Sequence, residues 1–387
     1  MAQPKIKPIR VGDRTRYRWV CDIGTDPKTG KRKQITRTFD RRKDAEADLA
    51  KTLHDVGRGA FAAPTKTTVN EFLDTWVRSA TRGKAANTVA NCTNALKPAR
   101  ERFGHLPLQK LTTVHVEDLV DWMLTSGRKR GGQPGTGLSP RSVQLTLSRL
   151  KSALDSAVHR RLVEFNVAAP VKCPTQAKTK REPWTPEEVK SFLASLAGHR
   201  LQAVLLLSLI GLRPAEVCGL RWSDIDLAAG TIAVGDNTRT IVWGEGGGKV
   251  EEKGAKTEAG KRKLPLPAPV SAALLAFQTL QADEKQAAEE AYTESGYVLV
   301  DELGRPCRTD WLRRRAYKLM DAAKVRRVRL YDARHACLTY LRMSGVPGPI
   351  VSAWAGHADL SMADRVYVHP NTEDLQQGRD VLAKLLG

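Results

Sequence analysis

The sequence lacks the patterns that mark zinc-binding, disulfide-rich, secreted and membrane-spanning proteins. Its six cysteines form no C-x-x-C pair, which argues against a zinc site and a disulfide framework and favours a reducing cytoplasm. The opening residues, MAQPKIKPIR, contain no apolar stretch of the secretory type. The longest apolar run, LQAVLLLSLIGL at residues 201–212, is too short to span a bilayer. We therefore expect a protein without a membrane segment, in which this run forms a buried helix.

Negative charge is scarce in the first half of the chain, and the 387 residues together carry a net charge of +21. Residues 1–180 contain 35 Lys and Arg against 16 Asp and Glu, whereas residues 181–387 contain 28 against 26. This uneven distribution predicts a polyanionic partner, most simply nucleic acid. Charges that served only solubility would not be divided along the chain in this way. The apolar content of 41% and the length allow two or three domains with real cores.

Residues 1–60 have the pattern of a small α+β unit. The segments RYRWVCDIG and KRKQITRTF alternate like strands, TDPKTG between them has turn chemistry, and residues 40–59 then read as a helix that ends at Gly57 or Gly59. A short sheet rich in Arg and Lys is suited to reading a DNA groove. The alternative is a subdomain that only caps its neighbour.

Residues 66–167 are predicted to form a helical bundle. Val69, Phe72, Leu73 and Trp76 follow the i, i+3, i+4, i+7 spacing of a helix with one apolar face. A later helix begins with Ser139 as N-cap and Pro140 in the first turn. Residues 168–184 contain three prolines and several lysines and read as a linker.

The last domain, residues 185–387, opens on a capping box in which Thr185 is the N-cap and Glu188 its partner. Helices are followed by short strands around GTIAVGD, TRTIVWG and KRKLPLP, and then by more helices from about residue 268 to the end. The predicted fold is thus multidomain and mainly α-helical with small β-sheets. It combines an α+β unit, a helical bundle and a mixed α/β domain.

Two basic segments of this domain are candidates for binding a phosphate. In GLRPAEVCGLRWSDID, Arg213 follows the apolar helix and Glu216 lies three residues on. A guanidinium at a helix boundary suits a phosphate clamp, although a structural ion pair is an equal alternative. The lysine-dense segment 253–267, KGAKTEAGKRKLPLP, suits a hairpin that carries a Lys to a leaving-group oxygen. Without further context, a run of solvated charges is the better interpretation of that segment.

Two further motifs contain ionisable aromatic groups. In RLYDARHACLTYL, the i, i+3, i+4 spacing predicts that Tyr331, Arg334 and His335 lie on one face of a helix. The expected packing positions of this helix are Leu330, Ala333, Cys337 and Leu338. In AGHADLSMADRVYVHP, His357 lies ten residues before Tyr367. Taken singly, either residue has an ordinary structural explanation.

The order of these motifs along the chain resembles that of the tyrosine recombinase (phage integrase) family. The resemblance covers most of the chain: residues 185–387 resemble the catalytic domain and the bundle resembles the core-DNA-binding domain. Residues 1–60 resemble the arm-binding domain that many phage and mobile-element integrases carry. Xer-type recombinases lack that domain, so the resemblance favours an integrase.

The resemblance implies a role for each candidate residue. Tyr367 would attack a scissile DNA phosphate and form a 3′-phosphotyrosine, with release of a 5′-hydroxyl. The other roles implied are phosphate binding by Arg213 and Arg334, protonation of the leaving oxygen by Lys256, a phosphate hydrogen bond from His357, and positioning of Arg213 by Glu216. Cations alone can stabilise the charge that develops in such a reaction, so no metal or other cofactor is expected. GEGGGKV at residues 244–250 lacks the spacing of a phosphate-binding P-loop and is interpreted as a hairpin tip.

One position departs from the family pattern. The family usually has a histidine three residues before the second arginine, where this sequence has Tyr331. A phenol is neutral at pH 7 and a poor base, but it can donate a hydrogen bond to a phosphate oxygen. Tyr331 is therefore interpreted as an accessory contact. His335 is either the missing imidazole or, as we favour, a packing residue.

The resemblance also implies partners. These are double-stranded DNA attachment sites, three further copies of the chain in a tetramer on a Holliday junction, and a directionality factor or host DNA-bending protein. The expected location is the cytoplasm, at the nucleoid when bound to DNA. The helical tail NTEDLQQGRDVLAKLLG would pack on a neighbouring protomer or on its own domain. The alternatives to an integrase are a Xer-like resolvase, a topoisomerase IB-like enzyme and an inactive DNA-binding protein of the same fold.

Overall fold

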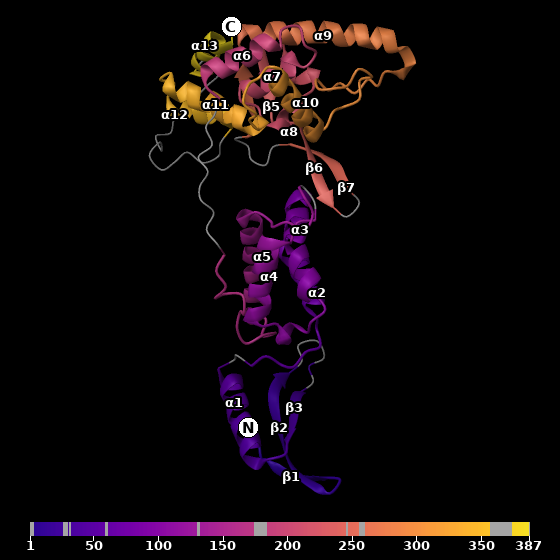
Figure 1. The fold of residues 1–387 in the computed structure, drawn as a ribbon, viewed down its shortest axis with the longest axis vertical. Coiled ribbons are helices and arrows are strands. Elements are labelled where there is room, and N and C mark those ends of the chain that lie inside the picture. Colours follow the sequence, from indigo (N-terminus) through magenta and orange to yellow (C-terminus); the bar gives the residue numbers. More distant parts are fainter. Residues whose placement is uncertain are drawn as a thin grey trace. The chain divides into compact units, whose positions relative to one another are not determined.

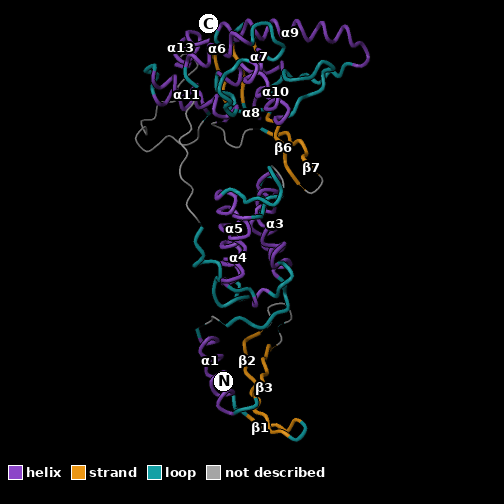
Figure 2. Tube along the Cα trace, in the orientation of Figure 1, coloured by secondary structure: helices purple, strands orange, loops and turns teal. Residues whose placement is uncertain are grey.

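The computed structural model describes residues 4–25, 30, 32–58, 61–129, 132–173, 184–244, 247–254, 260–356 and 374–386. The chain divides into two units, Met1–Lys178 and Thr179–Gly387, and Figure 1 follows their elements along the sequence. Helices predominate among the described residues, with strands in the N-terminal sheet and in two small sheets of the second unit (Figure 2). This confirms the predicted fold class. None of these helices has an apolar stretch long enough to cross a bilayer.

The first unit begins with a three-stranded antiparallel sheet. Its strands are β1 (Lys7–Val11), β2 (Arg14–Thr25) and β3 (Arg32–Phe39), in the order β1-β2-β3, and α1 (Arg42–Gly57) packs against it. Trp19 and Cys21 of β2 and Ala45 and Leu49 of α1 form its core. The strand pair and the helix end at Gly57 confirm the prediction, but β1 was not predicted. Its five residues are nearly all exposed, so its sequence shows no alternation.

The bundle consists of α2 (Val69–Ala80), α3 (Ala86–Phe103), α4 (Thr113–Thr125) and α5 (Pro140–His159), with a short 3₁₀ helix at Leu108–Lys110. The apolar stripe predicted for α2 is buried, and Ser139 caps α5 by accepting a hydrogen bond from the backbone N–H of Ser142. The bundle has an apolar core that shares no residue with that of the N-terminal sheet.

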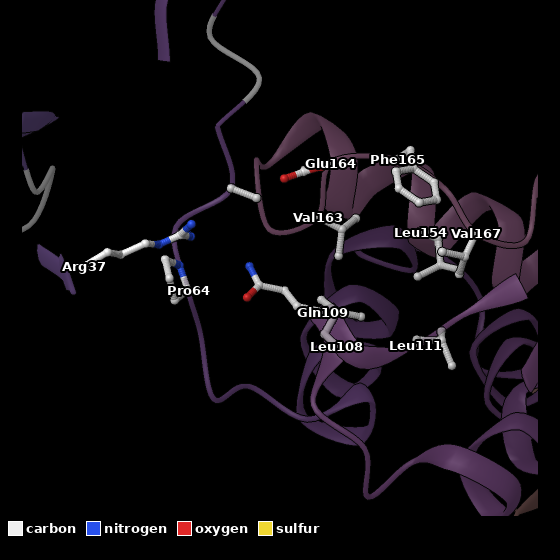
Figure 3. A pocket seen from close by; sticks show the side chains of 11 residues that line it. Arg37, Pro64, Leu108, Gln109, Leu111, Leu154, Val163, Glu164, Phe165 and Val167 are labelled. Carbon is white, nitrogen blue, oxygen red and sulfur yellow. The ribbon is translucent and has the colours of Figure 1, made fainter. Parts of the chain in front are cut away.

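A cavity of about 280 Å³ lies beside the bundle, in the first unit. Gln109 and Leu108 line it together with Arg37 of β3 (Figure 3). The Gln109 side-chain amide donates to the carbonyls of Ala63 and Leu162, at 2.8 and 2.9 Å. The amide thus fastens the segment that precedes α2, and its hydrogen bonds are directed at the protein itself.

In the second unit, helices surround an apolar core that is larger than the two cores of the first unit. Its elements are α6 (Pro186–Ser195), α7 (Gln202–Leu209), α8 (Pro214–Gly219), the 3₁₀ helix η2 (Trp222–Asp224), β4 (Ile225–Asp226), β5 (Thr231–Val234), β6 (Thr238–Gly244), β7 (Gly247–Lys253), β8 (Arg262–Pro265), α9 (Ala268–Ala288), η4 (Glu289–Ala291), α10 (Thr309–Ala322), α11 (Leu330–Met343), α12 (Gly348–Ala355) and α13 (Asp374–Leu386). The capping box of Thr185 and Glu188 forms as predicted, and α7 is buried along nearly its whole length.

The strands of this unit form two separate sheets. The antiparallel sheet β4-β5-β8 packs on the core. The hairpin β6–β7 forms the other sheet, and its residues come between β5 and β8 in the sequence. Gly244 pairs with Gly247, which confirms that GEGGGKV is a hairpin tip. The guanidinium groups of Arg221 and Arg239 each lie 4.8 Å from the centroid of the Tyr297 ring. Because Arg239 belongs to β6, its contact with this ring anchors the hairpin to the body of the unit.

Helix α13 packs on its own unit in this structure of a single chain. Leu375, Leu382 and Leu385 are buried, and α13 contacts α6, α11 and α12 (Figure 1).

The separate cores predict that the N-terminal sheet can unfold alone. Trp19→Ala removes the largest side chain of a core with four buried members and should cost about 3–5 kcal/mol. Hydrogen exchange measured by mass spectrometry should show faster exchange in β2, β3 and α1 but not in the bundle. Val20→Ala, at a position on β2 with 42% exposure, is the matched control and should change little. Equal loss of protection in the bundle would contradict independent cores.

Candidate active site

Arg213 lies at a sharp change of direction between two helices. Buried α7 ends at Leu209, and Gly211 has a φ of +103°, which a residue with a Cβ rarely adopts. Arg213 then caps α8, and Pro214 occupies its first turn. The backbone N–H and the Nη1 of Arg213 each donate to Glu216, both at 2.7 Å. The Arg213 side chain remains 30% exposed, whereas Glu216 is buried.

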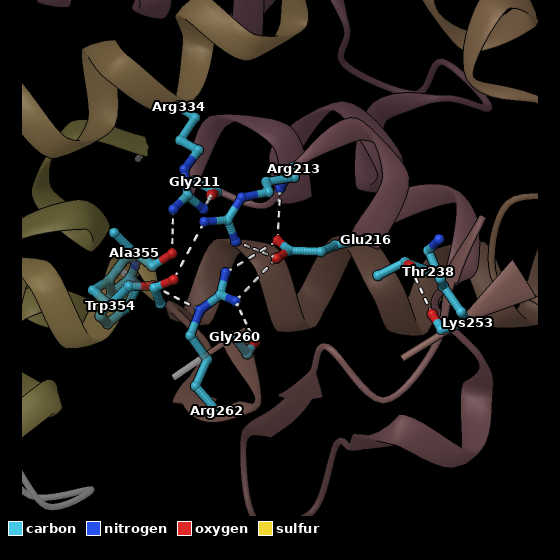
Figure 4. A network of polar contacts seen from close by, with 11 residues as sticks. Gly211, Arg213, Glu216, Thr238, Lys253, Gly260, Arg262, Arg334, Trp354 and Ala355 are labelled. Carbon is cyan, nitrogen blue, oxygen red and sulfur yellow. Dashed lines mark hydrogen bonds and ion pairs between the residues drawn. The ribbon is translucent and has the colours of Figure 1, made fainter. Parts of the chain in front are cut away.

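Glu216 is shared with a second guanidinium, that of Arg262 at the start of β8. Nη1 and Nη2 of Arg262 lie 3.1 Å from Oε1 and Oε2 of Glu216 (Figure 4). Burial opposes ionisation of this carboxyl, but the hydrogen bonds and charge of Arg262, followed by those of Arg213, hold the pKa of Glu216 below its ordinary value. The carboxylate is therefore charged at neutral pH and compensates two cations.

Arg334 reaches the same place from α11. Its side chain is 1% exposed, and it donates to the carbonyl of Gly211 at 2.6 Å and to that of Ala355. Burial, followed by the charges of Arg213 and Arg262, lowers the pKa of Arg334 to about 10. The guanidinium therefore remains protonated at pH 7, in an environment that raises the energy of its charge.

The three arginines meet at the C-terminal end of α12. Arg262 Nε donates to the carbonyl of Trp354 at 2.7 Å, Arg334 to that of Ala355, and Arg213 Nη2 to that of Gly356 at 3.3 Å. These are consecutive carbonyls at the end of a helix, where unpaired oxygens and the helix dipole favour cations. The sequence separations of 92, 21 and 143 residues show how far apart the contributing segments lie.

The two ionisable aromatic side chains of α11, Tyr331 and His335, are exposed, whereas Arg334 is buried. Tyr331 is 42% exposed and its ring packs edge-on against that of His335, with centroids 5.2 Å apart. Position 335 is itself exposed, so the contact that His335 makes is with the Tyr331 ring at the surface and not with the apolar core. The predicted packing positions of α11 are buried. The helix buries the stripe that contains Arg334, and Tyr331 and His335 lie beside that stripe rather than within it.

The structure thus brings together Arg213, Glu216 and Arg334 of the predicted site residues. Lys256, His357 and Tyr367 lie outside the described residues. The sequence analysis did not single out Arg262, whose only signal was a cation at the start of the strand KRKLPLP. Within the part of the chain that the structure describes, there is no group of His, Cys, Asp and Glu side chains that could hold a metal ion.

Comparison with known sequences places this site in a family. The pattern of the phage integrase family matches residues 184–374, a range that includes every predicted site residue. A tyrosine recombinase XerC-like protein of Caldanaerobacter subterraneus subsp. tengcongensis is 26% identical over 374 residues, which cover 91% of this chain and 92% of that protein. The ICEBs1 integrase of Bacillus subtilis is 23% identical over 380 residues, 96% of this chain and 97% of that one.

Solved structures share the fold. The integrase of the transposon Tn1549, in complex with a circular intermediate DNA, gives a TM-score of 0.60 at 19% identity over 82% of this chain and all of that one. A lambda integrase tetramer bound to a Holliday junction gives 0.55 at 16% identity over 93% and 97%. The family match and these relatives show that the chain is an enzyme that cleaves and rejoins DNA. The chain belongs to the phage integrase family of tyrosine recombinases.

The shared carboxylate predicts a pH-dependent stability. Glu216→Gln leaves the guanidinium of Arg262 buried without a counter-charge and should lower the free energy of unfolding by about 3–5 kcal/mol at pH 7. Because the folded pKa of Glu216 is lowered, its contribution is complete above the ordinary value of about 4.3 and is lost as the pH falls through the folded pKa. The difference between wild type and variant should therefore shrink in acid.

Urea unfolding at several pH values, followed by hydrogen exchange of peptides from α8 and β8, measures this difference. The matched control is Glu294→Gln, since Glu294 is 66% exposed and pairs with Lys285 at the surface. It should change the free energy by less than about 0.5 kcal/mol. A difference that is constant down to pH 3 would contradict a charged, paired Glu216.

Proposed function

We propose that this chain is an integrase that cleaves and rejoins DNA at attachment sites through a covalent 3′-phosphotyrosine on Tyr367. The observation that carries the proposal is the cluster of Arg213, Arg334 and Glu216 at the end of α12. Arg213 donates to the carbonyl of Gly356, and His357 directly follows Gly356. The cluster therefore lies at the start of the segment that leads to Tyr367.

The cluster suits the charge of the reaction. As the tyrosine oxygen attacks phosphorus, negative charge grows on the non-bridging oxygens, and fixed cations in a poorly hydrated site stabilise it strongly. Arg213 is partly exposed and its contact with the Gly356 carbonyl, at 3.3 Å, is its longest. A phosphate oxygen can replace that carbonyl. Arg334 is almost fully buried, so it binds a phosphate only after the atoms that cover it have moved.

The remaining roles complete the step. The bond from the Tyr367 oxygen to phosphorus forms as the bond to the 5′-oxygen breaks. The phenolic proton of Tyr367 passes to solvent water, Lys256 supplies the proton that makes the 5′-hydroxyl, and solvent then reprotonates Lys256. His357 and Tyr331 donate hydrogen bonds to the phosphate, and Glu216 holds Arg213. A 5′-hydroxyl of the partner strand then attacks the phosphotyrosine and releases Tyr367. The number of phosphodiester bonds is unchanged, so the exchange needs no nucleotide.

The functions proposed for the domains agree with the distribution of charge along the chain. Residues 1–60 would bind arm-type sites, residues 66–167 the core site, residues 168–184 would link them to the catalytic domain, and residues 185–387 would perform catalysis. The strongly basic first 180 residues support this. The lambda integrase relative, a tetramer on a Holliday junction, supports four protomers on two duplexes. A directionality factor or DNA-bending protein would assist them in the cytoplasm, at the nucleoid.

The nature of the element is supported by the relatives of similar length. The Bacillus subtilis relative is named an integrase and the Tn1549 protein is the integrase of a transposon, which favours an integrase of a phage or integrative element. The identity of 26% to a XerC-like protein favours a second candidate, a resolvase. A resolvase would recombine two identical sites on one molecule, whereas an integrase would join two different attachment sites.

Covalent trapping tests the proposal. Nicked DNA that carries a candidate attachment site should give an SDS-resistant adduct with the wild type, and peptide mapping should place it on Tyr367. Tyr367→Phe should give no adduct and should retain DNA affinity within about threefold, because only the nucleophile is lost. Tight binding of a site without any adduct would favour an inactive DNA-binding protein, and an adduct on another residue would refute the assignment of Tyr367.

The exposed phenol of Tyr331 predicts a smaller effect. Tyr331→Phe removes one hydrogen bond and should slow adduct formation by roughly 3- to 10-fold. His335→Gln, which keeps a polar side chain beside the same ring, is the paired variant and should have less effect than Tyr331→Phe. Single-turnover cleavage rates measure both. A loss in Tyr331→Phe as complete as that in Tyr367→Phe would show that the phenol is more than an accessory contact.

A further inference from the structure

Arg262 joins three segments of the second unit that are far apart in sequence. Its guanidinium binds both oxygens of Glu216 on α8, the carbonyl of Gly260 at 3.1 Å and the carbonyl of Trp354 at 2.7 Å (Figure 4). The Arg262 side chain is 6% exposed and Glu216 is 4% exposed. A guanidinium so fully enclosed by protein oxygens is not placed to bind a DNA phosphate, and its effect passes through its neighbours.

The residues that Arg262 contacts either hold a proposed catalytic group or lie close to one in the sequence. Glu216 holds Arg213 by two contacts of 2.7 Å. Trp354 is three residues before His357 along the chain, and Gly260 is four residues after Lys256. The backbone at Gly260 is also tightly packed, since a Cβ on Gly235 would lie 2.3 Å from the Gly260 oxygen. Arg262 is thus bonded to the carboxylate that holds Arg213 and to two backbone carbonyls that lie within four residues of Lys256 and His357 along the chain.

Stability alone does not explain an arginine at this position. The charge of Arg262 is one cause of the lowered pKa of Arg334, so the two guanidinium groups repel each other. Buried ion pairs often contribute less to stability than apolar residues of the same volume. What an apolar residue cannot do is bond to a carboxylate and two carbonyls together. The planar fork of Arg meets all three, and the single nitrogen of Lys does not.

We propose that Arg262 is a positioning residue for strand cleavage, which fixes Glu216 and the end of α12 relative to each other and thereby aims Arg213 at the scissile phosphate. The inference rests on the proposed function, because it concerns the rate of that cleavage. It adds a residue whose role is to set distances between groups that contact the DNA.

The test compares full-length variants on nicked DNA at saturating protein. Arg262→Met alone leaves the Glu216 carboxylate buried without its main partner, so Arg262→Met is combined with Glu216→Gln, which removes both charges of the pair at similar volume. Because Glu216 itself holds Arg213, the contribution of Arg262 is measured by comparing this double variant with Glu216→Gln alone. We expect the double variant to bind the site within about threefold of wild type, to form the adduct at least 100-fold more slowly than wild type, and to be slower than Glu216→Gln alone. Arg262→Lys, which keeps the charge, should lose roughly tenfold. The control Arg305→Met, in a pair with Asp301 where Arg305 is 63% exposed, should react like the wild type.

A second DNA substrate distinguishes a loss of Arg213 positioning from a general loss of structure at the site. A methylphosphonate at the scissile position has a methyl group in place of one non-bridging oxygen and therefore lacks the negative charge that Arg213 would neutralise. If Arg262 acts by aiming Arg213, the 100-fold defect should fall below about fivefold on this substrate. An equal defect on both substrates would show a merely structural role and overturn the inference, as would a wild-type rate in the double variant. If the wild type itself forms no adduct, the proposed function fails, and the inference fails with it.

Discussion

The carboxylate of Glu216 lies buried between the guanidinium groups of Arg213 and Arg262, and the arrangement of the candidate site depends on this contact. Arginine does not lose its proton at neutral pH, so cations that are brought close together need a fixed counter-charge. The free-energy cost of removing this carboxylate from water is offset by its interactions with two guanidinium groups rather than one. The same contact connects α8 to β8, which links the geometry of the site to the packing of the unit.

The end of α12 provides the second anchor. The carbonyls of Trp354, Ala355 and Gly356 accept hydrogen bonds from three arginines. Backbone oxygens thus supply hydrogen-bond acceptors to the cations in addition to the Glu216 carboxylate. A carbonyl oxygen carries only partial charge, and a phosphate oxygen can therefore replace it. Arg213 is the partly exposed member and Arg262 the enclosed one. In the proposed function, this division separates Arg213, which would contact the DNA, from Arg262, which would hold the other groups in place.

Much of the fold and part of the site followed from local sequence patterns. The capping box of Thr185 and the apolar run of α7 act within a few residues, and both were predicted. Strand β1 was missed because a mostly exposed edge strand carries no alternation of apolar side chains. The exposure of His335 did not follow from the sequence either, since helical spacing gives the relative directions of side chains and does not say where the buried stripe ends.

The sequence by itself determined the local elements, their caps, the uneven distribution of charge and the residue types that suit phosphoryl transfer. Only the tertiary structure decided which guanidinium groups are enclosed and which partner each one has. Arg262 illustrates the reason: its partners Glu216 and Trp354 lie 46 and 92 residues away. Periodicity and capping arise from contacts over one or two helical turns, whereas the meeting of these groups depends on how the apolar core packs the helices together.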